Sequence, residues 1–148
     1  MNNSFLTQLW IVCKIWFFAV LTNTLLGTFY LSDFFSRPNA VADLMTIGAV
    51  YASIFSFPAM VILLLIINRC IAAKTKGLQL FRIVFISGIS LSMAVFLVFW
   101  STVHPLRNTE MGTLLCIAVL AAITGIVTQY KSILQSGSDL QQFPVADR

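Results

Sequence analysis

The residues best suited to chemistry, His104, Arg107 and Glu110, fall together in one short polar stretch. An imidazole, a guanidinium and a carboxylate could exchange protons or bind an anion. His104 is the sole histidine of the sequence, and Pro105 follows it and favours a turn. We interpret the three residues as a solvated turn rather than as an active site.

The rest of the sequence offers little further chemistry. There is no G-x-S-x-G, no H-E-x-x-H, no glycine-rich phosphate loop and no family motif. One histidine cannot supply paired haem ligands or a histidine metal cluster. Cys13, Cys70 and Cys116 are far apart and odd in number, which argues against a disulfide framework, and Cys13 and Cys116 suit small apolar fillers. We expect no enzyme, with no catalytic, cofactor-binding or metal-binding residue.

Composition places the chain in lipid rather than in water. Hydrophobic residues make up 59% and charged residues 9% of 148 residues, whereas soluble domains average about 45–50% and about 25%. Too few polar side chains are present to cover a water-soluble surface. The net charge of +4 comes from basic residues that lie between apolar runs, so we expect no nucleic-acid partner.

Four apolar stretches reach the length of about 20 residues that a helix needs to cross a bilayer. The last three contain no Asp, Glu, Lys, Arg or His, each of which would be costly in hydrocarbon. The sequence therefore predicts an all-α, polytopic membrane protein, a single domain over residues 1–148 whose four transmembrane helices form one antiparallel bundle. The predicted spans cover residues 10–31, 44–67, 83–103 and 111–130, and a polar cytoplasmic tail follows over 131–148.

The start of the first span has two interpretations, because Lys14 lies inside it. In one, the span begins at Ile15 and the segment from Phe5 to Lys14 lies along the interface. In the other, a continuous helix carries Lys14, whose ammonium group reaches back to the lipid headgroups. Trp10 and Trp16 suit an interfacial position in both cases.

Positive charge is distributed unequally between the two predicted sides. The termini and the middle connection hold seven of the nine basic residues, and the opposite side holds only Arg37 and Arg107. The positive-inside rule therefore predicts that both termini are cytoplasmic. The first 13 residues carry no basic side chain, which argues against a cleavable signal peptide. We expect a location in a cell membrane, with the bacterial inner membrane favoured.

Small or polar residues at four-residue spacing indicate which helix faces meet, because in lipid close backbone approach drives association. The predicted packing residues are Ala19, Asn23 and Gly27 in the first span, Gly48, Ala52 and Ser56 in the second, Gly88 and Ser92 in the third, and Ala121 and Gly125 in the fourth; Ala118 and Ala122 form another pair there.

Two residues in the spans stand out individually. Asn23 is the most polar side chain deep in a span, and we expect it to face inward as structural glue, toward Ser53, Ser56 or Ser92. Binding of a ligand by Asn23 is the alternative. Pro58 is expected to bend the second helix, because proline removes a backbone donor.

These observations favour a non-enzymatic accessory or partner-binding membrane protein. Its partners would be the lipid bilayer and either another membrane protein or a second copy of itself. The alternative is a transporter or channel subunit that works as an oligomer, with a path lined or bent by Thr22, Asn23, Thr24, Thr28 and Pro58. The absence of a carboxylate in the spans weakens this alternative.

Overall fold

The computed structural model describes residues 3–31, 38–75, 77–102 and 108–138. Within these ranges the chain forms five helices and no strand. The helices are α1 (Asn3–Leu31), α2 (Pro38–Ala72), α3 (Gly77–Thr102), α4 (Asn108–Thr128) and α5 (Tyr130–Ser138). The first four are long and apolar enough to cross a membrane. This arrangement confirms the predicted all-α fold with four transmembrane helices.

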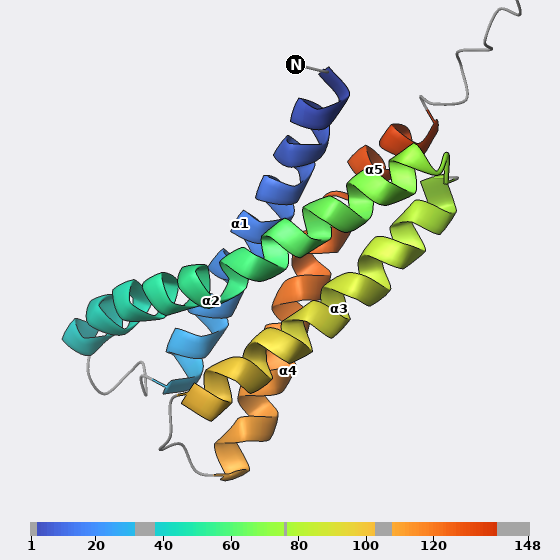
Figure 1. Ribbon diagram of the computed structural model, residues 1–148. Helices are drawn as coiled ribbons and strands as arrows, with labels where there is room; N and C mark the ends of the chain where they lie inside the picture. Colours follow the sequence, from blue (N-terminus) through green and yellow to red (C-terminus); the bar gives the residue numbers. More distant parts are fainter. Residues whose placement is uncertain (1–2, 32–37, 76, 103–107, 139–148) are drawn as a thin grey trace, which may run out of the picture.

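The four long helices form one antiparallel bundle (Figure 1). Helix α1 packs against α2 and α4, and α3 packs against the other sides of α2 and α4. Helical structure follows from the solvent, because lipid offers no partner to backbone N–H and C=O groups and each span must satisfy its own.

The helices extend beyond the predicted spans. Helix α2 is 35 residues long, about 52 Å at about 1.5 Å per residue, whereas the hydrocarbon core is about 30 Å thick. Tilt and protrusion beyond the core both accommodate such a length. Helix α2 continues through Pro58, and the expected bend at this residue stays a prediction.

Helix α1 is continuous from Asn3 to Leu31 and has no break at Lys14. Of the two sequence interpretations, the structure therefore shows the continuous helix. The Lys14 ammonium nitrogen lies 5.0 Å from the centroid of the Trp10 ring, within the range of a cation–π interaction. This contact holds the lysine along the helix, toward its N-terminal end.

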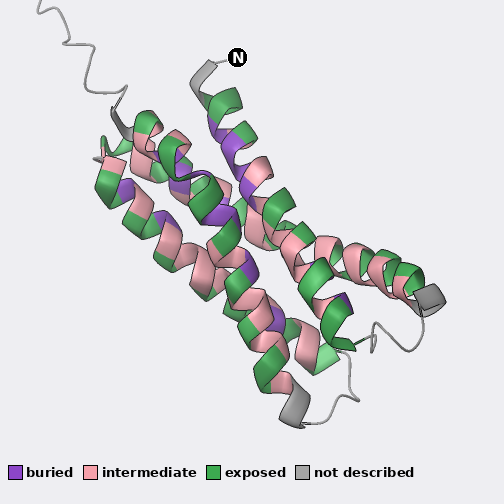
Figure 2. Ribbon diagram, turned by 180° about the vertical axis from the view of Figure 1, so that it is seen from behind, coloured by how far each residue is buried: buried purple, intermediate pink, exposed green. Residues whose placement is uncertain are grey.

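The buried core lies at one end of the bundle, where the start of α1, the end of α2, the start of α3 and the end of α4 meet. Most of the buried segments in Figure 2 lie toward this end. The core cluster consists of Ile11, Val12, Ile15, Leu63, Ile67, Leu80, Val84, Ile126 and Ile133. The bundle is therefore tightly packed at one end.

Helix α5 caps the packed end, which corrects the interpretation of residues 131–148 as a polar tail throughout. Only 2% of Ile133 is exposed, and its side chain joins the core. A Cβ atom added to Gly77 would lie 2.7 Å from the Leu134 carbonyl oxygen, so the start of α3 and the backbone of α5 are in direct contact. The Tyr130 ring meets the Phe81 ring edge to face at 4.8 Å. The first part of the predicted tail thus belongs to the folded bundle.

The connection between α2 and α3 is shorter than the predicted stretch from Asn68 to Arg82, since α2 ends at Ala72 and α3 begins at Gly77. Lys74 adopts a left-handed conformation with φ of 54°. The Thr75 amide donates to the Cys70 carbonyl oxygen at 3.0 Å. A left-handed residue with such bonds is a common way to end a helix.

Helix α4 approaches its neighbours through glycine contacts. A Cβ atom on Gly125 would lie 2.5 Å from the Ile15 carbonyl oxygen and 3.2 Å from the Ala19 Cβ atom. A Cβ atom on Gly88 of α3 would overlap the Ile126 side chain. Glycine therefore sets the spacing of α1, α3 and α4 near the packed end.

Replacement of Gly125 by alanine is expected to destabilise the bundle by about 1–3 kcal/mol, because the new methyl group meets fixed backbone atoms of α1. Gly112 of the same helix has no atom within 4 Å of the position that a methyl group would take, so Gly112→Ala is the matched control. Gly112→Ala is expected to stabilise the bundle by about 0.5–1 kcal/mol, because alanine has a higher helix propensity than glycine. Unfolding in mixed micelles, followed by circular dichroism, measures both changes. Equal effects of the two substitutions would contradict the close α1–α4 contact.

Candidate binding cavity

A cavity of about 470 Å³ lies between the four long helices, and all four contribute to its lining. It is partly open to the outside of the bundle rather than enclosed. Its volume falls in the range of about 300–1,000 Å³ that is typical of small-molecule sites. Size and position therefore make it the candidate site of this protein.

The cavity begins where the packed core ends. Val12, Ile15, Leu63 and Ile126 belong both to the core cluster and to the cavity lining. From Val12 the lining continues along α1 to Leu31, a rise of about 28 Å along the helix axis. The cavity is thus long, and one of its ends is closed by buried aliphatic side chains.

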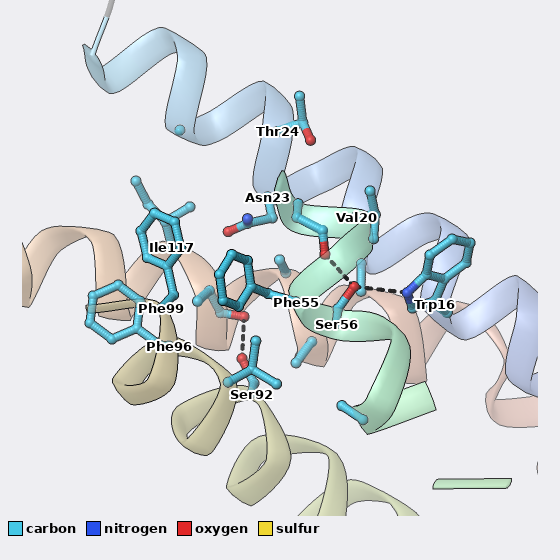
Figure 3. Close-up of a pocket in the computed structure, with 18 of the residues that line it drawn as sticks. Trp16, Val20, Asn23, Thr24, Phe55, Ser56, Ser92, Phe96, Phe99 and Ile117 are labelled. Carbon is cyan, nitrogen blue, oxygen red and sulfur yellow. Dashed lines mark hydrogen bonds between the residues drawn. The ribbon is translucent and has the colours of Figure 1, made fainter. Parts of the chain in front are cut away.

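Aromatic side chains line the cavity where α2 and α3 meet. The Phe55 ring of α2 contacts the Phe99 ring of α3 edge to face, with centroids 5.4 Å apart. Tyr51 stacks on Phe55 at 6.3 Å along α2. Figure 3 shows Phe55, Phe96 and Phe99 gathered on one side of the cavity. These large rings occupy the contact between the two helices beyond the packed core.

Several polar side chains of the lining have partners within the bundle. The Trp16 indole donates to the Ser56 hydroxyl oxygen at 2.8 Å, which joins α1 to α2. The Ser56 hydroxyl donates in turn to the Ala52 carbonyl oxygen. The Ser92 hydroxyl donates to the Ala118 carbonyl oxygen at 2.9 Å, which joins α3 to α4 (Figure 3). These hydrogen bonds tie neighbouring helices together around the cavity.

Asn23 of α1, by contrast, forms no hydrogen bond with the described residues. Figure 3 shows the Asn23 amide beside the Phe55 ring, directed into the cavity. Ser56 and Ser92 form their hydrogen bonds with Trp16 and Ala118, and no hydrogen bond of the described residues involves Asn23. The interhelical hydrogen bonds that we expected from Asn23 to Ser53, Ser56 or Ser92 are therefore not formed within the described part of the chain.

Thr24 is the next residue of α1 and also lines the cavity. Only 8% of Thr24 is exposed, and its hydroxyl oxygen is buried without a hydrogen-bond partner among the described residues. Hydroxyl groups elsewhere in the helices donate to a carbonyl one turn back, as Thr46 does to Ala42 and Thr124 does to Leu120. The Thr24 hydroxyl does not form such a bond, so Asn23 and Thr24 of α1 both have donors and acceptors without a partner among the described residues.

The lining is uncharged. None of the described residues that surround the cavity is Asp, Glu, Lys, Arg or His. A charged group moved here would lose its hydration without gaining a counter-ion, which is costly. The arrangement can therefore hold an uncharged molecule by dispersion contacts and a few hydrogen bonds. It offers no carboxylate, imidazole or amine for proton transfer within the described lining.

The structure gathers most of the residues that the sequence singled out. Nine of the ten predicted packing residues line the cavity, and Gly125 lies instead at the α1–α4 contact. The nine are Ala19, Asn23, Gly27, Gly48, Ala52, Ser56, Gly88, Ser92 and Ala121. Of the residues that the transport alternative placed on a path, Asn23, Thr24 and Thr28 line the cavity, whereas Thr22 and Pro58 do not. The sequence did not identify Trp16 or Phe55 as lining residues.

The polar cluster of the sequence analysis lies elsewhere. His104 and Arg107, like the side chain of Glu110, lie outside the described residues. Cys13, Cys70 and Cys116 are not joined in disulfides. Among the described residues no group of three His, Cys, Asp or Glu side chains could hold a metal ion.

Comparison with protein-family models, with curated proteins and with solved structures found no match for the chain. The class of the protein therefore follows from fold and site alone. It is an integral membrane protein with four apolar helices in one bundle and a largely apolar cavity between them.

Substitution of Ser92 by alanine is expected to lower the free energy of unfolding by about 0.5–1.5 kcal/mol, because it removes the hydrogen bond between α3 and α4. Ser101→Ala is the matched control, since the Ser101 hydroxyl donates to Val98 within its own helix.

Asn23→Leu is expected to raise the free energy of unfolding, because it removes an amide that no described residue satisfies. Denaturation by sodium dodecyl sulfate in mixed micelles compares the three variants. A loss of stability in Asn23→Leu as large as that in Ser92→Ala would show that Asn23 is structural glue after all.

Proposed function

We propose that the protein is a non-enzymatic membrane protein that binds an uncharged, largely apolar molecule from the bilayer between its four helices. The observation that carries this proposal is the cavity of about 470 Å³, whose described lining contains no Asp, Glu, Lys, Arg or His side chain. Binding sites for small molecules are typically concave, mostly apolar and equipped with few polar groups. The cavity has all three properties.

The surroundings of the cavity favour an apolar guest over water. A buried water molecule needs two to four polar partners, and most of the lining is aliphatic or aromatic. An empty cavity would leave the lining atoms without dispersion contacts on one side. The cavity is partly open to the outside of the bundle, and we propose that its guest enters from among the acyl chains.

This proposal gives specific content to the accessory role that the sequence favours. The bound partner at the cavity would be a small lipophilic molecule. Contact with another membrane protein or with a second copy of the chain stays a prediction. Transport through a single bundle is less well supported, because the cavity ends against the buried core at Val12 and Ile126. A path between several copies likewise stays a prediction.

The positive-inside rule indicates which side of the membrane the packed end of the bundle faces. Arg69, Lys74, Arg82 and Lys131 are exposed near the packed end that α5 caps. We propose that this end faces the cytoplasm, in a cell membrane for which the bacterial inner membrane is favoured. The cavity then extends into the opposite half of the bilayer, and its guest would come from that leaflet.

A long-chain alkane with a mid-chain diazirine tests the proposal by photo-crosslinking in lipid nanodiscs. Mapping by mass spectrometry should place crosslinks on cavity residues such as Ala52, Ala118 and Leu91 in preference to exposed residues such as Ile54 and Leu97. Labelling spread evenly over exposed and lining residues would contradict the proposal.

Ala122→Leu should reduce this cavity labelling several-fold, because the larger side chain occupies part of the cavity. Ala94→Leu is the matched control, since it adds the same volume to an exposed position of α3. Helical content and elution volume identify any variant that fails to fold. Undiminished labelling in folded Ala122→Leu would remove the cavity as the binding site.

A further inference from the structure

We infer that the guest carries an uncharged hydrogen-bonding group, a carbonyl or a hydroxyl within a hydrocarbon chain, and that the Asn23 amide binds this group. The inference rests on the proposed function and adds the chemical class of the molecule. Its basis is the mismatch between a largely apolar cavity and one amide directed into it (Figure 3).

The Asn23 amide is the lining group that can both donate and accept hydrogen bonds at separate atoms and that the bundle leaves without a partner among the described residues; the hydroxyls of Thr24, Thr28 and Tyr51 also line the cavity. Trp16, Ser56 and Ser92 already form hydrogen bonds with the protein. Asn23 has both donors and an acceptor, and the hydrogen bonds of the described residues do not involve it. An amide without a partner in an apolar environment is costly. A guest that brings the missing partner recovers this free energy on binding.

Thr24 provides an independent observation at the same level of α1. Its hydroxyl oxygen is buried and has no partner among the described residues. Its methyl group would lie 3.8 Å from a Cβ atom on Gly48, so this part of α1 faces α2. Two adjacent polar side chains with unused hydrogen-bonding capacity mark one level of the cavity. Thr28, one turn further along α1, also lines the cavity, and most of the remaining lining is aliphatic or aromatic.

The position of Asn23 indicates where the polar group of the guest lies. The lining of α1 runs from Val12 to Leu31. Asn23 lies about 16 Å from its closed end and about 12 Å from its other end at about 1.5 Å per residue. Hydrocarbon can therefore extend from the polar group toward both ends. The guest is accordingly a lipid-like molecule whose carbonyl or hydroxyl lies within the chain.

The charge of the cavity excludes an ionised head group at this level. The described lining has no cationic side chain to pair with a carboxylate or phosphate, and no anionic one to pair with an amine. A neutral carbonyl can accept from the Asn23 amide, and a neutral hydroxyl can donate to or accept from it. Both groups would be satisfied without a counter-ion.

Competition against the diazirine alkane tests the inference in nanodiscs, with 9-heptadecanone and heptadecane as the two competitors. The measured quantity is the ratio of their half-competition concentrations, because differences in lipid partitioning cancel when the same ratio is compared between variants. From the wild type to Asn23→Leu, the preference for the ketone should fall about fivefold, the effect of one hydrogen bond of ordinary strength. Heptadecane should compete equally well in both proteins.

Two further variants keep the test falsifiable. Thr24→Val should reduce the preference for the ketone by a smaller factor, since it removes the neighbouring hydroxyl. Thr124→Val should leave the preference unchanged, because Thr124 is exposed and bonded to its own helix. If heptadecane competes but the ketone ratio is the same in wild type and Asn23→Leu, the inference is wrong and the proposed function stands. If neither competitor displaces the probe from the wild type, the proposed function itself fails.

Discussion

The close approach of α4 to α1 and α3 is the contact on which the rest of the structure depends. In lipid the hydrophobic effect does not bring helices together, so dispersion contacts between closely spaced backbones and interhelical hydrogen bonds must do so. Gly125 admits the Ile15 carbonyl of α1, and Gly88 admits the Ile126 side chain of α4. Helix α5 then covers the same end through Ile133. Beyond this end the Phe55–Phe99 ring contact joins α2 to α3, and the cavity lies between the four helices.

The parts of the fold that could be predicted are those that depend on local sequence. Apolar length alone identifies the four spans, and four-residue spacing places residues such as Asn23 and Gly48 on the faces that line the cavity. Helix α5 escaped prediction because Ile133 and Leu134 are two apolar residues in a polar stretch, and their burial depends on where α3 lies. The Trp16–Ser56 bond joins residues 40 positions apart, and no local pattern pairs them.

The cavity combines an apolar lining with a small amount of unsatisfied polarity. The hydroxyls of Ser56 and Ser92 stabilise helix pairs, whereas Asn23 and Thr24 lack such partners within the described chain. A polar group that serves packing alone would be expected to find a partner on a neighbouring helix. The retention of polarity at one level of α1 is therefore more consistent with recognition of a guest than with assembly of the bundle. The absence of Asp, Glu, Lys, Arg and His from the described lining sets the limits of its chemistry.

Solid-state NMR of deuterated protein with protonated methyl groups in protonated lipid tests the central claim, that one end of the bundle is packed and the other holds a lipophilic guest. The account predicts cross-peaks from hydrocarbon chain protons to the methyl groups of Ala52 and Ala118, which line the cavity. It predicts none to the methyl groups of Val84 and Ile133 in the packed core. Cross-peaks of equal strength to both sets, or to the core methyl groups alone, would contradict it.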